Sequence, residues 1–107
     1  MTPNEYQTAC LRTWARRDDD AEASNAALGL AGEVGEVVEI VKKDLYHSKP
    51  ADMEKLRAEL GDCGYYLAVL CHVYGLTLGD VFAANIAKLR ARHPDGWSPG
   101  YHHQRQN

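Results

Sequence analysis

Residues 28–45 read LGLAGEVGEVVEIVKKDL, and residues 56–74 read LRAELGDCGYYLAVLCHVY. Apolar residues recur in both stretches at the three- and four-residue spacing of a helix that buries one face. In the first stretch they are Leu30, Val34, Val37, Val38 and Val41. In the second they are Leu56, Leu60, Cys63, Leu67, Leu70, Cys71 and Tyr74. We therefore predict two long helices, over Ala21–Leu45 and from an N-cap at Asp52 to Tyr74, joined by a loop at 47–50.

One shorter helix is predicted on either side of this pair. The first spans Pro3–Arg17, because Thr2 can cap it and Glu5 can close a capping box. The last runs from Leu78 to Arg92 behind the cap Thr77 and ends before Pro94. Their predicted inward residues are Tyr6, Ala9, Cys10 and Thr13 in one helix and Val81, Phe82, Ile86 and Leu89 in the other. The predicted fold class is an all-α, four-helix bundle without strands.

Length and composition narrow the class of protein. A chain of 107 residues suits one domain, which we place at 1–97, with an extended tail at 98–107 anchored by Trp97. Its core is small, so assembly as a homodimer or tetramer is expected. The net charge of -3 argues against a nucleic-acid partner. The lack of an apolar run of about 20 residues, of a signal peptide and of a disulfide pattern predicts a cytoplasmic protein without a membrane partner.

Carboxylates occur as two matched pairs, Glu33 with Glu36 and Glu59 with Asp62. Residues three apart share a helix face, and a short loop makes the two helices antiparallel neighbours. Four carboxylates that converge in a partly desolvated groove repel one another unless a cation neutralises them. Magnesium prefers such oxygen ligands, whereas zinc prefers Cys and His. The four acids are therefore the predicted ligands of Mg²⁺, with Glu39 outside the set.

The spacing between the acids has a simpler interpretation that must be weighed. A single E-x-x-E on a helix is usually a solvated face, but two register-matched pairs are uncommon by chance. Each pair also encloses a glycine, Gly35 or Gly61. Glycine inside a helix costs about 1 kcal/mol relative to alanine. We therefore expect the backbone to approach another group closely at these glycines.

This ordered set of acids resembles the signature of the MazG-like, all-α nucleoside triphosphate pyrophosphatase superfamily, E-x-x-E followed by E-x-x-D. The resemblance extends to Leu28-Gly29-Leu30, to Tyr66 and to the run 85–94, and covers about residues 6–97. It implies hydrolysis of a nucleoside triphosphate between the α- and β-phosphates, with Mg²⁺ or substituting Mn²⁺. Some branches carry a further Glu where this chain has Gly32. The general base is therefore either Glu33 or Glu36.

The resemblance also suggests where the substrate is held. Lys88 and Arg92, with Asn85 on the same helix, are candidates to balance the charge of leaving pyrophosphate, and Lys42 and Lys43 are possible helpers. Tyr66 is a candidate to bind a phosphate. Trp14 and Gln7 are candidates to stack on and read a base. The competing interpretations are a charged outer face for Lys88 and Arg92, and a core or interface role for Trp14, Tyr65 and Tyr66.

Three functions remain as alternatives at this stage. The favoured one is nucleotide pyrophosphohydrolysis, in house-cleaning of the nucleotide pool, with a preference for deoxynucleotides. A redox di-metal bundle would require Glu-x-x-His pairs, and the nearest form is Asp44-x-x-His47, which occurs once. A non-catalytic module of the same fold, binding a nucleotide or a protein, is compatible with Gly32. The sequence does not decide base or sugar preference.

Overall fold

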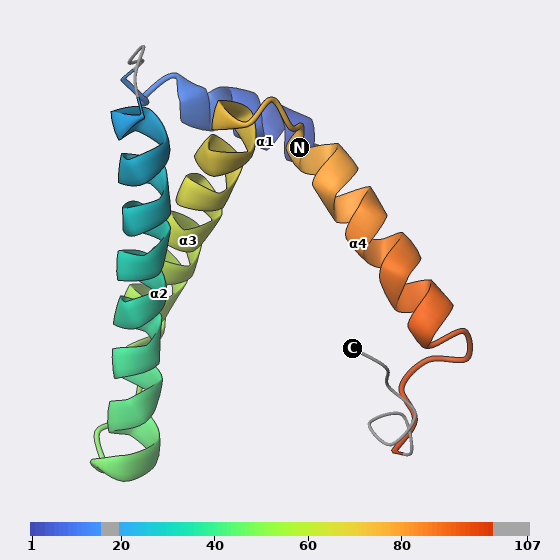
Figure 1. The fold of residues 1–107 in the computed structure, drawn as a ribbon. Coiled ribbons are helices and arrows are strands. Elements are labelled where there is room, and N and C mark those ends of the chain that lie inside the picture. The colour runs from blue at the N-terminus through green and yellow to red at the C-terminus, as the bar shows by residue number, and fades with distance from the viewer. Residues whose placement is uncertain (16–19, 100–107) are drawn as a thin grey trace.

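Four helices make up the described part of the chain, residues 1–15 and 20–99 of a computed structural model. They are α1 (Pro3–Leu11), α2 (Ala21–Tyr46), α3 (Met53–Val73) and α4 (Leu78–Arg92). These residues contain no strand, so the predicted all-α class is confirmed. Helices α2 and α3 form an antiparallel hairpin. Helix α1 lies across the hairpin at its open end, and α4 leaves from there in another direction (Figure 1).

Side-chain caps start three of the helices at the predicted residues. Thr2 and Glu5 form a complete capping box at α1, with each side chain accepting from the other's backbone N–H. The Asp52 carboxylate accepts from two N–H groups in the first turn of α3. The Thr77 hydroxyl accepts from one N–H group in α4. Each cap satisfies a donor that the helix itself leaves without a partner.

The first helix ends six residues before its predicted end at Arg17. It stops at Leu11, because the next three N–H groups bond to carbonyls only three residues back, at 3.2–3.3 Å, which tightens the last turn. The Thr13 hydroxyl also donates to the Cys10 carbonyl at 3.0 Å. The prediction over Pro3–Arg17 was therefore wrong in extent, although Arg17 itself lies outside the described residues.

A sharp elbow separates α3 from α4. Gly75 adopts φ of 74°, in the left-handed region that glycine tolerates best, and the Leu76 N–H returns to the Cys71 carbonyl at 2.8 Å. This is a common way to close a helix C-terminus. The axes of α3 and α4 differ in direction by 102°, so α4 contacts α1 and α3 but not α2 within the described residues.

The core lies at this elbow, where α1 crosses α3. Its buried apolar residues are Cys10, Ala26, Ala68, Val69, Cys71 and Leu78. Gln7 is buried with them, and its amide is fully used. The Nε2 group donates to the carbonyls of Ala68 and Leu76 at 3.0 and 3.1 Å, and Oε1 accepts from the Leu78 N–H at 2.9 Å. Gln7 therefore fastens α1 to both sides of the elbow.

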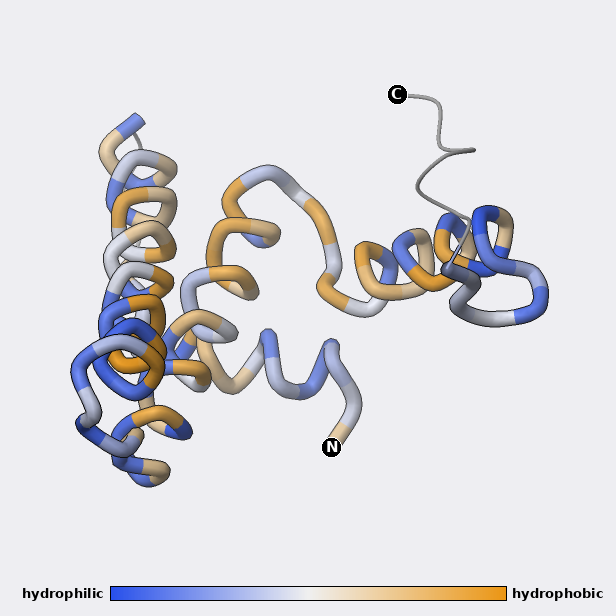
Figure 2. The backbone as a smooth tube through the Cα atoms, turned by 90° about the horizontal axis from the view of Figure 1, so that it is seen from below, coloured by the Kyte–Doolittle hydropathy of each residue, from blue (hydrophilic) through white to orange (hydrophobic). Residues whose placement is uncertain are grey.

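Several residues that were predicted to face inward are exposed in the single chain. They are Val34, Val38 and Val41 on α2, Leu60 and Tyr74 on α3, and Phe82, Ile86 and Leu89 on α4. The elbow explains the α4 residues, because it carries this helix away from the hairpin. Figure 2 shows hydrophobic positions recurring along the projecting helix. The radius of gyration is 17.0 Å, against about 13 Å for a compact domain of this length.

No single helix in the described ranges is long and apolar enough to cross a membrane. Helices α3 and α4 meet the length and composition criteria only as a pair, and they are bent relative to each other by 102°.

Candidate metal centre

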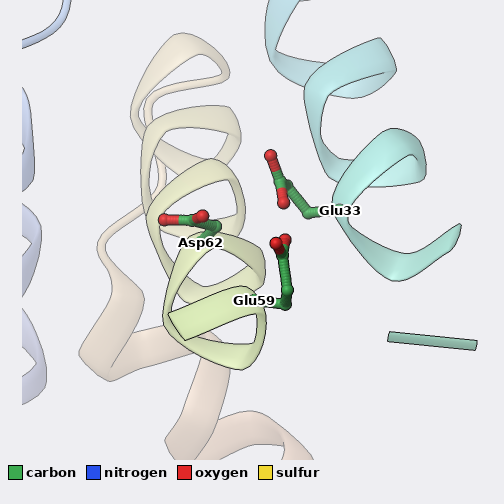
Figure 3. A group of neighbouring side chains, drawn as sticks. All are labelled: Glu33, Glu59 and Asp62. Atoms are coloured by element: carbon green, nitrogen blue, oxygen red, sulfur yellow. The ribbon is translucent and has the colours of Figure 1, made fainter. Parts of the chain in front are cut away.

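Three of the four predicted ligands converge on the α2–α3 seam. Glu33 of α2 and Glu59 and Asp62 of α3 each offer a carboxylate oxygen, and these oxygens lie within 4.8 Å of one another. Figure 3 shows Glu33 reaching from α2 toward Glu59, with Asp62 one turn further along α3. Glu33 and Glu59 are half-buried and Asp62 is exposed. One face of the group is therefore open to a ligand. We call these three residues the acidic group.

Crowding in the acidic group changes its protonation. The pKa of Glu33 is raised from 4.5 to about 7, first by a hydrogen bond with Glu59, then by desolvation, and then by the charges of Glu59, Asp62 and Glu36. Near neutral pH a proton on Glu33 thus competes with a metal cation, because either one relieves the repulsion among the three carboxylates.

The donor atoms of the acidic group suit a hard cation. All three donors are oxygens, which is the ligand chemistry of Mg²⁺ and Mn²⁺. The neighbouring Cys63 adds no soft ligand, because burial, followed by the charges of Glu33, Glu59 and Asp62, raises the pKa of its thiol. A thiol that keeps its proton is a poor metal ligand. The residues present therefore fit the predicted magnesium site.

Glu36 is not among the three carboxylates that converge within 4.8 Å, so its role as a fourth ligand stays a prediction. Because the two helices are antiparallel, the order of the acids is reversed along the seam. Glu36 follows Glu33 toward the α2–α3 connection, whereas Asp62 follows Glu59 away from it. Glu36 is exposed, although its charge still contributes to the raised pKa of Glu33. Glu39, predicted to be outside the site, pairs with Lys42 and Lys43 at 3.9 Å.

An aromatic group formed by Trp14, Tyr65 and Tyr66 lies next to the acidic group, on the side away from the α2–α3 connection. The ring centroids are 5.1–6.4 Å apart in edge-to-face contacts, a favourable arrangement for aromatic rings. The Tyr66 ring packs on Gly29, where a side chain would have no room. Tyr66 follows Asp62 by four residues and Gly29 precedes Glu33 by four. The aromatic group is thus one helical turn from the acids.

Hydrogen bonds hold this aromatic group within the chain. The Trp14 indole N–H donates to the Glu22 carboxylate at 2.9 Å, and the hydroxyls of Thr13 and Tyr65 are hydrogen-bonded at 3.1 Å. The interface role expected for Tyr65 stays a prediction. Trp14 and Tyr66, both proposed as substrate contacts, do lie together.

Other predicted substrate contacts lie away from the acidic group. Gln7 is buried at the elbow, where its three hydrogen bonds leave no polar atom to read a base. Asn85, Lys88 and Arg92 are exposed on α4, which does not contact α2. Trp97 is 75% exposed and does not pack as an anchor.

The motif glycines behave differently from the prediction. A methyl group added at Gly35 or Gly61 would meet nothing within 4 Å. The close approaches occur instead at Gly29, beneath Tyr66, and at Gly64, where a methyl group would lie 3.2 Å from the Tyr6 hydroxyl. Tyr6 reaches the Gly61 carbonyl at 3.4 Å. It therefore ties α1 to α3 beside Asp62, a role that its position in a predicted core stripe did not reveal.

A cavity of about 310 Å³ lies beside the acidic group, at the α2–α3 connection. Its charged lining residues are Glu36, Glu39, Lys43, Lys49, Asp52 and Lys55. Sequence reasoning missed Lys49 and Lys55. The available signal was the position of Lys55, four residues before Glu59 and thus one turn away on the same helix.

Residues 22–97 match a family described as the MazG nucleotide pyrophosphohydrolase domain. A curated relative, the "Gene 37 protein" of Mycobacterium phage L5, is 35% identical over 77 residues, which is 68% of each chain. No solved structure matches the chain significantly.

Proposed function

The chain belongs to the MazG nucleotide pyrophosphohydrolase family, and from this premise we propose that it hydrolyses nucleoside triphosphates to monophosphates and pyrophosphate with Mg²⁺. The observation that carries the proposal is the convergence of Glu33, Glu59 and Asp62 within 4.8 Å. Deoxynucleoside triphosphates are the proposed substrates, and house-cleaning of the cytoplasmic nucleotide pool is the proposed role.

We assign separate roles to the acids. Glu33, Glu59 and Asp62 would hold the ion, which when bound would polarise the phosphoryl oxygens of the substrate. Glu36 is exposed one turn away and is not committed to the acidic group, so it is our candidate to orient and deprotonate the attacking water. Gly32 carries no carboxylate that would take this role.

We propose that the aromatic group binds the nucleoside. Tyr66 and Trp14 lie one turn from the acids, and the edges or faces of their rings offer a surface for a base. Gln7 is not part of this proposal, because its amide is used inside the core.

We further propose that the active protein is a homo-oligomer. A second copy would cover six apolar side chains of α2 and α4 that are 41–56% exposed, namely Val34, Val38, Val41, Phe82, Ile86 and Leu89. Burying them is favourable by about 25 cal/mol per Å². Asn85, Lys88 and Arg92 would then reach a neighbouring copy's acidic group. Sedimentation analysis tests this: a monomer at micromolar concentration contradicts the proposal.

Pyrophosphate release from each nucleoside triphosphate in the presence of Mg²⁺ tests the proposed reaction. Glu59→Gln and Asp62→Asn should lower the rate by at least about a hundredfold, because each removes a charged ligand. Glu54→Gln, an exposed glutamate on the same helix outside the acidic group and the cavity, is the matched control and should keep the rate. Absence of release from every nucleotide would favour the non-catalytic binding module. Equal release by the wild type and both ligand variants would indicate a contaminating enzyme.

A further inference from the structure

We propose that the cavity at the α2–α3 connection receives the β- and γ-phosphates of the substrate, so that the nucleotide lies lengthwise along the α2–α3 seam. This inference rests on the proposed function and adds a direction to it: nucleoside toward Trp14 and Tyr66, pyrophosphate toward Lys49 and Lys55.

Three chemically different zones follow one another along the seam. The aromatic group packs on Gly29, the acidic group begins four residues later at Glu33, and Glu36 and Ile40 line the cavity beyond it. Each step is about one helical turn, or roughly 5–6 Å along the axis. An apolar ring system, a metal-bridged phosphate and a terminal anionic group occur in the same order in a nucleoside triphosphate. The order of zones therefore fixes the direction of the substrate.

The cavity gathers lysines from three separate segments. Lys43 comes from the last turn of α2, Lys49 from the connection and Lys55 from the first turn of α3. The backbone brings them together: Ser48 adopts φ of 51°, and the Lys49 N–H then bonds to the Lys43 carbonyl at 3.2 Å. This turn folds the connection back over the end of α2. Phosphate oxygens are strong acceptors for such ammonium groups.

The lining of the cavity carries three carboxylates and three lysines, so its ion pairs determine which ammonium groups are available to an anion. Asp52 is occupied by capping bonds to α3, and Glu39 is shared between Lys42 and Lys43. Within residues 1–15 and 20–99, neither Lys49 nor Lys55 has an ion-pair partner. Glu36 lines the side nearest the acidic group. Two ammonium groups thus remain for an anionic ligand.

The volume of the cavity is compatible with this occupant. About 310 Å³ lies at the lower end of the range of small-molecule sites, about 300–1,000 Å³. It suits a compact diphosphate and leaves the nucleoside outside, on the aromatic group. The chain therefore supplies cations for the leaving group without α4.

Calorimetric titration of the full chain with inorganic pyrophosphate in the presence of Mg²⁺ tests the inference. Lys49→Ala/Lys55→Ala should bind pyrophosphate about tenfold or more weakly, at about three- to fivefold per exposed charge pair. Its affinity for Mg²⁺ alone should stay unchanged. Lys55→Arg should retain most of the binding. Arg57→Ala is the matched control, because Arg57 is an exposed cation on α3 outside the cavity. Unchanged pyrophosphate affinity in the double variant would overturn the proposal.

A second pair of variants separates this inference from the proposed function. If Lys88→Ala/Arg92→Ala abolishes pyrophosphate binding while Lys49→Ala/Lys55→Ala does not, the leaving group lies at α4 and the cavity proposal is wrong, whether or not the protein turns over nucleotides. Because the titration needs no turnover, loss of binding in the cavity variant supports the subsite even in a protein that releases no pyrophosphate.

Discussion

Magnesium binding should expel a proton from Glu33, and the amount should depend steeply on pH. The pKa of Glu33 in the metal-free protein is about 7. At pH 6 this carboxyl is therefore roughly 90% protonated and at pH 8 roughly 10%. An ion that binds only the deprotonated form displaces about 0.9 proton at pH 6 and about 0.1 at pH 8. The apparent affinity for Mg²⁺ should accordingly be about tenfold weaker at pH 6 than at pH 8.

Calorimetry in two buffers of different ionisation enthalpy measures the released protons directly. Glu33→Gln should remove the pH-dependent release and weaken binding at every pH, whereas the control Glu39→Gln should keep the wild-type profile. If Mg²⁺ binds the wild type with equal affinity at pH 6 and pH 8 and releases no proton, the acidic group does not hold the ion in the way that we describe.

Further predictions concern stability. The folded state keeps the Glu33 proton that the unfolded chain loses above pH 4.5, so the metal-free protein should lose stability as pH rises from 4.5 to about 7; urea titrations should show this slope, and Glu33→Gln should flatten it. Gln7→Leu should destabilise the fold by about 1–3 kcal/mol, because it leaves the buried Leu78 N–H without an acceptor and removes the bonds donated to the Ala68 and Leu76 carbonyls; an unchanged urea midpoint would contradict the role of Gln7. Gly29→Ala should cost about 1–3 kcal/mol by overpacking against Tyr66, whereas Gly35→Ala, which meets open space, should stabilise the single chain by up to about 1 kcal/mol. Equal thermal shifts for the two glycine variants would contradict this contrast.

Local signals predicted the elements well. Side-chain caps are determined by residues within one turn of each other, so Thr2, Asp52 and Thr77 were identified as helix starts from the sequence. The end of α1 was missed for the opposite reason. Trp14 continues a helical pattern, but its indole N–H bonds to Glu22 and its ring packs against Tyr65 and Tyr66. A tertiary contact outweighs local helix propensity here.

Packing between elements was less accessible from the sequence. Periodicity identifies an apolar face but does not say which surface covers it, so Phe82 and Ile86 were assigned to a core that the elbow at Gly75 moves out of reach. Gln7 shows the converse case. A polar residue on a short helix indicated a ligand contact, whereas its partners are backbone groups 61–71 residues further along the chain.

The sequence identified the acids of the candidate metal centre, but it did not show which of their carboxylates converge. Identity and spacing of the acids placed Glu33, Glu59 and Asp62 together. Glu36 was included because each motif carries two acids three residues apart. Spacing does not determine the side-chain conformation, and in the structure Glu36 lines the cavity at the α2–α3 connection.

The three hydrogen bonds of Gln7 have a consequence for the order of events during synthesis. Helix α1 leaves the ribosome first, yet its partners at Ala68, Leu76 and Leu78 follow only after most of the chain has been made. The hairpin of α2 and α3, with its carboxylates, is complete before the N-terminal segment can dock. Shortening the chain from the C-terminal side to before Leu76 should therefore leave α1 held by its contacts with α3 alone, with Cys10, which packs in the core with Leu78, more open to thiol-modifying reagents.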